Sequence, residues 1–181
     1  MKLIAAAFLL TAVVSAQEPP ANPLVTVSKA VYAYVNSDIL RSLDKIPDDL
    51  WSFQPTKDVR TVGQLFAHIA DGQYEFCGVV SEGHSVLKGI EKTAKTKAEV
   101  ASALKDAIAY CNAAYAKMTD ANAADIVSFF GMKMTKLGLM DMNTAHNMEH
   151  YGNLVTYMRL KGIVPPSSES PMPAASASSK K

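Results

Sequence analysis

Cysteine is scarce in this sequence, and its scarcity limits the kinds of site that the chain can build. The only two cysteines are Cys77 and Cys111. Structural zinc sites usually enclose the ion with several cysteines. A closed, cysteine-rich zinc site is therefore not expected.

An excess of charge of either sign is also lacking. The sequence has 18 Lys and Arg against 17 Asp and Glu, a formal net charge of +1. Binding to nucleic acid or to an anionic membrane surface needs clustered basic residues that outnumber their acidic neighbours. The composition therefore predicts no nucleic-acid partner.

Long apolar segments are absent after residue 14. The run Leu3–Val14 follows Met1-Lys2 and leads into Val14-Ser15-Ala16, which is the three-part layout of a secretory signal peptide with cleavage after Ala16. The run is short for a bilayer span, and Gln17–Pro20 ends it in turn-forming residues, which argues against a buried helix. The residue directly after the cleavage site is Gln17 and not a cysteine, so no lipid anchor is expected. We predict a periplasmic or secreted protein that has no membrane contact once residues 1–16 are removed.

Apolar residues are also rare at the other end of the chain. Residues 165–181 are Pro165-Pro166 followed mostly by Ser, Ala and Pro. Such a composition cannot bury a core, so we predict a disordered tail. Residues 17–164 remain, which is the length of one domain.

Helical periodicity dominates that domain. Thr61-Val62-Gly63-Gln64 and Thr96-Lys97-Ala98-Glu99 read as capping boxes at two helix starts, and Gly162 is a candidate C-cap. A stripe along the first helix includes Val27, Val31 and Tyr34. No convincing alternating strand pattern competes, so we predict an all-α four-helix bundle, with helices over about 24–45, 61–81, 96–118 and 135–161.

The connector between the second and third helices leaves their relative direction open. It spans about residues 82–95, long enough to run back along a helix or simply to bulge. Cys77 lies sixteen residues after Thr61, and Cys111 lies fifteen after Thr96, so parallel helices would place the cysteines at nearly the same height. A disulfide, which export would permit, and two free buried cysteines both remain open.

Three histidines are the strongest candidates for chemistry. His146 and His150 lie four residues apart on a mostly apolar helix face, so both imidazoles point into the bundle. Burial without a partner is costly for two adjacent imidazoles, and a shared metal ion relieves that cost. His68 lies on the inward face of the second helix, and Gly72 leaves space beside it. Three imidazoles with an open fourth position are typical of catalytic zinc sites, whereas His84 follows Gly83 in the connector and is expected to be solvated.

Two segments that contain these histidines resemble a known family. Residues 55–70 and 144–162, with their flanking Gly and Arg residues, are similar to the DinB/YfiT superfamily of metalloenzymes. The resemblance covers nearly the whole mature domain. It implies a divalent metal bound by His68, His146 and His150 and a bundle with the order up-down-down-up. We expect the ion to be zinc or nickel before other ions.

The resemblance says less about the reaction. Relatives of this type include thiol-dependent transferases and a mycothiol-dependent isomerase, and many have no assigned reaction. An exported protein would not reliably meet the reduced thiols of the cytosol. The function expected here is a metal-dependent hydrolase or transferase of unknown substrate, with a small-molecule substrate and a homodimer both left open.

Two polar residues are candidates for the surroundings of the metal. Asn143 lies one turn before His146, and Glu75 lies two turns after His68. Either could hold a ligand or a water molecule in place. The alternative is that both are ordinary polar residues near an end of the bundle.

Methionine supports a second hypothesis. Thioethers together with imidazoles favour copper, which an exported copper-binding protein would use. Methionine is also a common filler of cores. A third hypothesis is a bundle that binds a partner or a small molecule without metal chemistry. The methionines concerned are Met132, Met134, Met140, Met142 and Met148.

Overall fold

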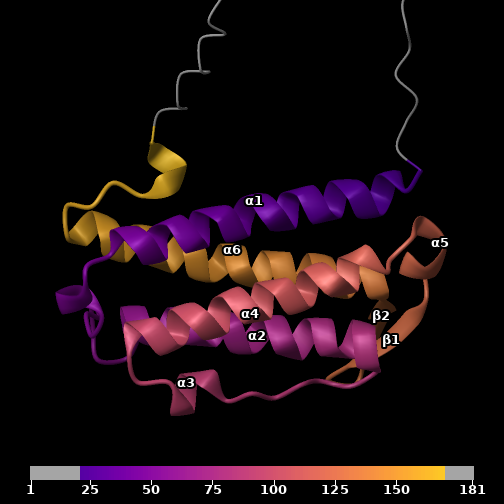
Figure 1. Cartoon of the computed structure of the whole chain (residues 1–181), viewed down its shortest axis with the longest axis horizontal. Helices are drawn as coiled ribbons and strands as arrows, with labels where there is room; N and C mark the ends of the chain where they lie inside the picture. Colours follow the sequence, from indigo (N-terminus) through magenta and orange to yellow (C-terminus); the bar gives the residue numbers. More distant parts are fainter. Residues whose placement is uncertain (1–20, 170–181) are drawn as a thin grey trace, which may run out of the picture.

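The structure is a computed structural model that describes residues 21–169, and it consists there of six α-helices and one short hairpin (Figure 1). The four long helices lie side by side and pack into a bundle, as the sequence predicts. The predicted signal peptide and the end of the tail lie outside the described residues. The long helices are α1 (Pro23–Lys45), α2 (Val62–Glu82), α4 (Lys97–Ala116) and α6 (Lys136–Leu160).

Capping residues fix where three of the four long helices begin, namely α2, α4 and α6. The Thr61 side chain accepts a hydrogen bond from the Gln64 backbone while the Gln64 side chain accepts one from the Thr61 backbone, and Thr96 with Glu99 repeats this arrangement at α4. Each pair satisfies backbone N–H groups that the first turn leaves free. Both predicted capping boxes are confirmed, and Thr135 caps α6 through the Gly138 backbone.

The predicted inward stripe of α1 is partly wrong. Val27, Val31 and Tyr34 are exposed, whereas Tyr32 is fully buried and its ring lies against the ring of Tyr115. The exposed residues and the buried residues Val25, Tyr32 and Val35 all recur at helical spacing, so periodicity alone could not show which face of α1 is buried. The consequence is an apolar face on α1 that the described residues do not cover.

A short hairpin lies between α4 and α6, where the sequence predicted no strand. Strands β1 (Ile126–Phe129) and β2 (Met132–Thr135) pair antiparallel, with Phe129 opposite Met132. The turn uses Phe130 and Gly131, both with positive φ, as tight hairpin turns require. Each strand has only four residues, too few to produce a clear alternating pattern. The short helix α5 (Asp120–Ala123) precedes the hairpin.

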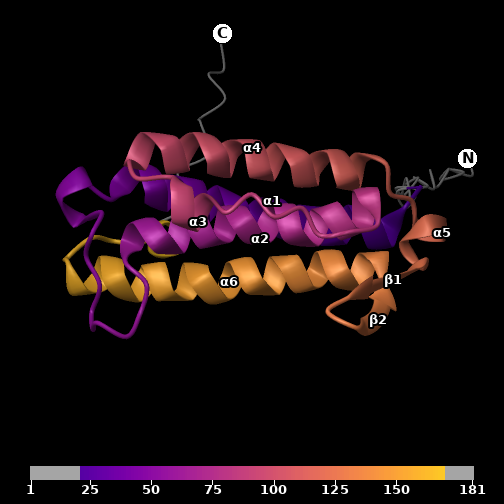
Figure 2. The same ribbon diagram turned by 90° about the horizontal axis from the view of Figure 1, so that it is seen from below.

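The connector between α2 and α4 runs back along α2. It contains the short helix α3 (Ile90–Thr93), and Figures 1 and 2 show it lying beside α2, so that α2 and α4 begin at the same end of the bundle. Cys77 of α2 and Cys111 of α4 are joined in a disulfide in the structure, with a Cα–Cα distance of 5.3 Å. This arrangement leaves α3 beside the first half of α2, where it can contribute to a site.

The loop before α2 is fastened to the bundle by aromatic rings. The short 3-10 helix η1 (Asp48–Leu50) starts it, Trp51 stacks on Phe66, and Phe53 meets the edge of Tyr157. The Tyr157 hydroxyl also donates to the Arg60 carbonyl over 3.0 Å. The loop is thereby held against the C-terminal half of α6.

The predicted start of the disordered tail at residue 165 is wrong for the part that the structure describes. Residues 165–169 contain the 3-10 helix η2 (Pro166–Ser168), and Pro166 is buried. Glu169 pairs with Arg41 and Lys45, and the Ser167 backbone donates to the Tyr151 hydroxyl. Composition alone missed these contacts because they come from α1 and α6.

Among residues 21–169, no helix combines the length and the apolar character that a bilayer crossing requires.

Candidate metal centre

Three histidine rings from two helices converge inside the bundle. His146 Nε2 lies 3.2 Å from His68 Nε2 and 3.1 Å from His150 Nε2. One ring nitrogen of each lies within 4.8 Å of those of the other two. The structure thus brings together the three residues that the sequence singled out, and His84 is exposed in the connector, as predicted.

A glycine makes room for the central ring. A Cβ atom added at Gly72 would lie 2.7 Å from His146 Cε1 and 3.1 Å from His146 Nδ1, closer than carbon atoms pack. The space beside Gly72 therefore holds the ring of His146, across the interface between α2 and α6. The Phe76 ring covers another side of His146, with centroids 5.5 Å apart.

Burial keeps these imidazoles neutral. It lowers the pKa of His146 to about 3, with the neighbouring His150 and His68 rings adding to the effect, and it lowers the pKa of His150 to about 4. The pKa of His68 is also lowered, first by burial and then by the Arg60 charge. Neutral imidazole is the form that donates a lone pair to a metal ion.

Glu91 orients His68, a role that no pattern in the sequence indicated. Glu91 Oε2 lies 3.3 Å from His68 Nδ1, and Glu91 Oε1 accepts a hydrogen bond from Arg60 Nε over 3.0 Å. A carboxylate at Nδ1 places the proton there and leaves the lone pair on Nε2. Glu91 comes from α3, which reaches the site only because the connector runs back along α2, so no spacing in the sequence could reveal it.

The other two histidines have amide neighbours. The Asn153 Nδ2 atom lies 3.4 Å from His150 Nδ1. His146 Nδ1 is buried with no hydrogen bond among the described residues, and both polar atoms of the buried Asn147 side chain share that condition. The Asn147 side chain acts on the pKa of His146 in the direction opposite to burial and raises it. Asn147 and Asn153 are further residues that sequence reasoning missed.

The two predicted outer residues have different surroundings. Asn143 is buried in the core, where its Nδ2 donates to Gln73 Oε1 over 2.9 Å and contacts both disulfide sulfurs. Glu75 is half-buried, and burial followed by the charge of Asp71 raises its pKa. Within residues 21–169, neither forms a hydrogen bond or ion pair with a histidine. Asn143 therefore supports the core around the disulfide.

The donor set fits a divalent metal ion. Zinc–nitrogen bonds of about 2.0–2.1 Å at angles between about 90° and 109° place ligand nitrogens about 2.9–3.4 Å apart, which brackets the two Nε2 separations. Without an ion, the lone pair of His68 Nε2 would face the Nε2 atom of His146, because Glu91 places the His68 proton on Nδ1. Imidazole ligands suit zinc, nickel, copper and iron.

The methionines do not gather into one cluster. Met140 lies in the core with its sulfur 3.9 Å from Cys77 Sγ, and Met134 packs beside Phe129 in the part of the core next to the hairpin. Met132, Met142 and Met148 are exposed. Met140 therefore fills core space, and the scattered thioethers do not form the methionine-rich ligand set of a copper site.

A cavity of about 740 Å³ adjoins the histidines. The 54–60 loop, the start of α2, Glu91 of α3 and the second half of α6 enclose it, and His150 forms part of its wall. Concave spaces of this size with convergent polar groups commonly bind small molecules. The cavity therefore adjoins the candidate metal centre on the side of His150.

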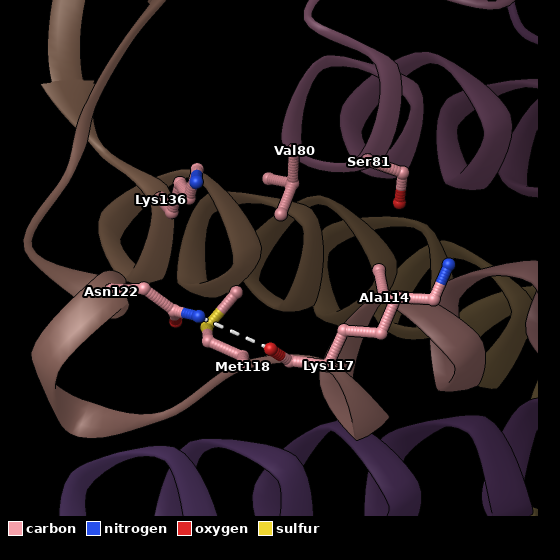
Figure 3. Close-up of a pocket in the computed structure, with 7 residues that line it drawn as sticks. All are labelled: Val80, Ser81, Ala114, Lys117, Met118, Asn122 and Lys136. Atoms are coloured by element: carbon pink, nitrogen blue, oxygen red, sulfur yellow. Dashed lines mark hydrogen bonds between the residues drawn. The ribbon is translucent and has the colours of Figure 1, made fainter.

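A smaller cavity of about 200 Å³ lies near the hairpin end of the bundle (Figure 3). Lys117, Met118, Asn122 and Lys136 contribute to its wall, and the Asn122 amide donates to the Lys117 carbonyl. Lys136 is already paired with Asp125 over 2.8 Å. No histidine lines this cavity, so it is separate from the candidate metal centre.

Comparison with known proteins identifies related sequences. The sequence model of the DinB superfamily matches residues 32–154. The uncharacterised protein YjoA of Bacillus subtilis (strain 168) is 26% identical over 122 residues, which cover 66% of this chain and 79% of YjoA.

Solved structures have the same fold. The crystal structure of YjoA matches with a TM-score of 0.62 at 22% identity and covers 83% of this chain and 100% of that one. A DinB-like protein from Bacillus cereus ATCC 10987 gives 0.63 at 20% identity, with 77% and 93% of the two chains covered. A mycothiol-dependent maleylpyruvate isomerase gives 0.60 at 10% identity over 72% of this chain and 59% of that chain. At these identities the likeness concerns the fold.

Proposed function

The chain belongs to the DinB superfamily, and on that premise we propose that it binds one divalent metal ion through His68, His146 and His150 and acts as a metal-dependent hydrolase or transferase. The observation that carries this proposal is the convergence of the three Nε2 atoms, with separations of 3.1 and 3.2 Å. Zinc or nickel is the proposed ion. Three imidazoles and an open position are the ligand set of catalytic rather than structural sites.

The residues around the site have separate roles in this proposal. A bound divalent ion supplies Lewis acidity and lowers the pKa of water towards neutrality. The three histidines hold the ion, and Glu91 fixes the tautomer and orientation of His68. Phe76 shields His146 from water, and the adjoining cavity of about 740 Å³ admits a small substrate.

We also propose that the protein acts outside the cytosol. The three-part N-terminal sequence over residues 1–16 supports export. The bridge between Cys77 and Cys111 supports it as well, because disulfides persist in oxidising compartments. A low-molecular-weight thiol is therefore not the preferred cosubstrate. Fractionation of cells that produce the full chain, with detection of the form cleaved after Ala16, tests the location.

Metal titration of the untagged protein tests the proposed binding. One zinc or nickel ion should bind per chain, and His146→Ala should abolish binding because a three-ligand site cannot spare its central ligand. His84→Ala is the matched control and should bind metal normally. A His146→Ala variant that binds as tightly as the unmodified protein would refute the proposal. Copper binding that is lost on replacing Met132 and Met134 would support the copper-binding alternative.

A further inference from the structure

Arg60 lines the cavity beside His150. One edge of its guanidinium group is held by a hydrogen bond, and the other edge is free. Arg60 Nε donates to Glu91 Oε1 over 3.0 Å, and the Arg60 backbone oxygen accepts the Tyr157 hydroxyl over 3.0 Å. Nη1 and Nη2 of Arg60 form no hydrogen bond with any group of residues 21–169. Two contacts thus hold the residue in place while its two terminal nitrogens remain available to a ligand.

Glu91 connects this arginine to the metal ligands. Its second carboxylate oxygen lies 3.3 Å from His68 Nδ1. A ligand bound at the free edge of Arg60 would therefore lie in the same cavity as the metal site, since Arg60 and His150 both line it.

The other charges in the cavity indicate which anion would fit. Lys57 and Arg60 are its basic residues, and Asp58, Glu91 and Glu149 are its acidic residues, a formal balance of −1. A divalent ion at the histidines changes this balance to +1, which permits a carboxylate at the guanidinium. A free guanidinium edge binds a carboxylate through two parallel hydrogen bonds.

We propose that Arg60 binds a carboxylate of the substrate and that the substrate is a small bifunctional molecule whose other end reaches the metal site. This inference rests on the proposed function, because it needs an ion at the three histidines. It goes beyond that function by naming the substrate class and the residue that selects it.

Carboxylate binding to the cobalt(II)-loaded full chain tests the inference without an enzyme assay. The probes are acetate, which can bind the ion alone, and malonate, succinate and glutarate, which can bind the ion and Arg60 together. The visible spectrum of cobalt reports each affinity. At least one dicarboxylate should bind about 10- to 100-fold more tightly than acetate, the range expected for hydrogen bonds to a charged group.

Variants identify the residue responsible. Arg60→Gln should remove the advantage of the dicarboxylate over acetate, and Arg60→Lys should recover only part of it. Lys57→Gln is the matched control, because it removes the same charge from the same cavity, and it should keep the advantage. The ratio of the two affinities is measured within one variant at saturating cobalt, so it does not depend on small changes in metal affinity.

Several outcomes would overturn the inference. They are equal binding of acetate and all three dicarboxylates, an unchanged ratio in Arg60→Gln, or the same loss in Lys57→Gln as in Arg60→Gln. Loss of cobalt binding in Arg60→Gln would also overturn it, because Arg60 would then belong to the metal site itself. Failure of the unmodified protein to bind cobalt would instead refute the proposed function.

Discussion

A single methyl group added at Gly72 should separate the metal site from the stability of the fold. In Gly72→Ala the new Cβ would lie 2.7 Å from His146 Cε1. Carbon atoms pack at about 3.5–4.0 Å, so the His146 ring must move by about 1 Å. Metal–ligand distances tolerate only about 0.2 Å of change. The variant should therefore lose the central ligand and bind zinc more than about tenfold more weakly.

The unfolding free energy should fall by no more than about 2 kcal/mol, because two effects partly offset each other. Alanine is about 1 kcal/mol more favourable than glycine inside a helix, and the displaced ring costs about 1–3 kcal/mol if it cannot swing away. Gly152→Ala is the matched control. Gly152 lies in α6, and its added Cβ would meet no atom within 4 Å. That variant should gain up to about 1 kcal/mol and keep its zinc affinity.

The assay is competition for zinc against a chromophoric chelator, together with urea unfolding of the metal-free proteins. The expected pattern is weak zinc binding by Gly72→Ala alone, with metal-free proteins that all unfold cooperatively and with unfolding free energies within about 2 kcal/mol of the unmodified protein. Equal zinc affinities in Gly72→Ala and the unmodified protein would contradict the placement of His146 as a ligand packed against Gly72.

Three further predictions concern the disulfide, the response to acid and the orientation of a ligand. Thiol titration of the unfolded, unreduced protein should find no free thiol at Cys77 or Cys111, and reduction should cost about 3–4 kcal/mol for a bridge that spans 34 residues; two titratable thiols would contradict the bridge. The metal-free protein should lose stability as the pH falls from about 6.5 towards the pKa values of about 3 for His146 and about 4 for His150, because the unfolded chain binds more protons in that window. Each histidine contributes up to about 1.4 kcal/mol per pH unit. Replacing both with Gln should therefore reduce the dependence of the unfolding free energy on pH, as measured by urea unfolding. Glu91→Gln should weaken zinc binding about 10- to 100-fold, and an unchanged affinity in the chelator assay would show that the carboxylate does not orient its histidine.

The parts of the fold that depend on local chemistry could be predicted from the sequence. Thr61 and Thr96 cap α2 and α4 through contacts within four residues of each helix start, so the signal is complete in a short segment. The shared face of His146 and His150 follows equally from the helical repeat. These features needed no knowledge of how the helices pack.

Features that depend on the packing of distant segments could not be predicted. The first helix has two apolar faces, and contacts with Tyr115 of α4 and Gln73 of α2 accompany the burial of Tyr32. Glu91 reaches His68 through the path of the connector, and Glu169 finds its basic partners on α1. Gly72 illustrates the same limit, because the sequence indicated an open space near it but not which ring would fill that space.

The ligands of the bound ion are the most direct test of the central claim. X-ray absorption spectroscopy of the untagged, zinc-loaded protein measures the number, type and distance of the atoms around the metal. If His68, His146 and His150 bind the ion, the spectrum should show nitrogen and oxygen atoms at about 2.0–2.1 Å from zinc. It should fit three imidazole rings and no sulfur. A sulfur shell near 2.3 Å, or fewer than three imidazole rings, would contradict the three-histidine site.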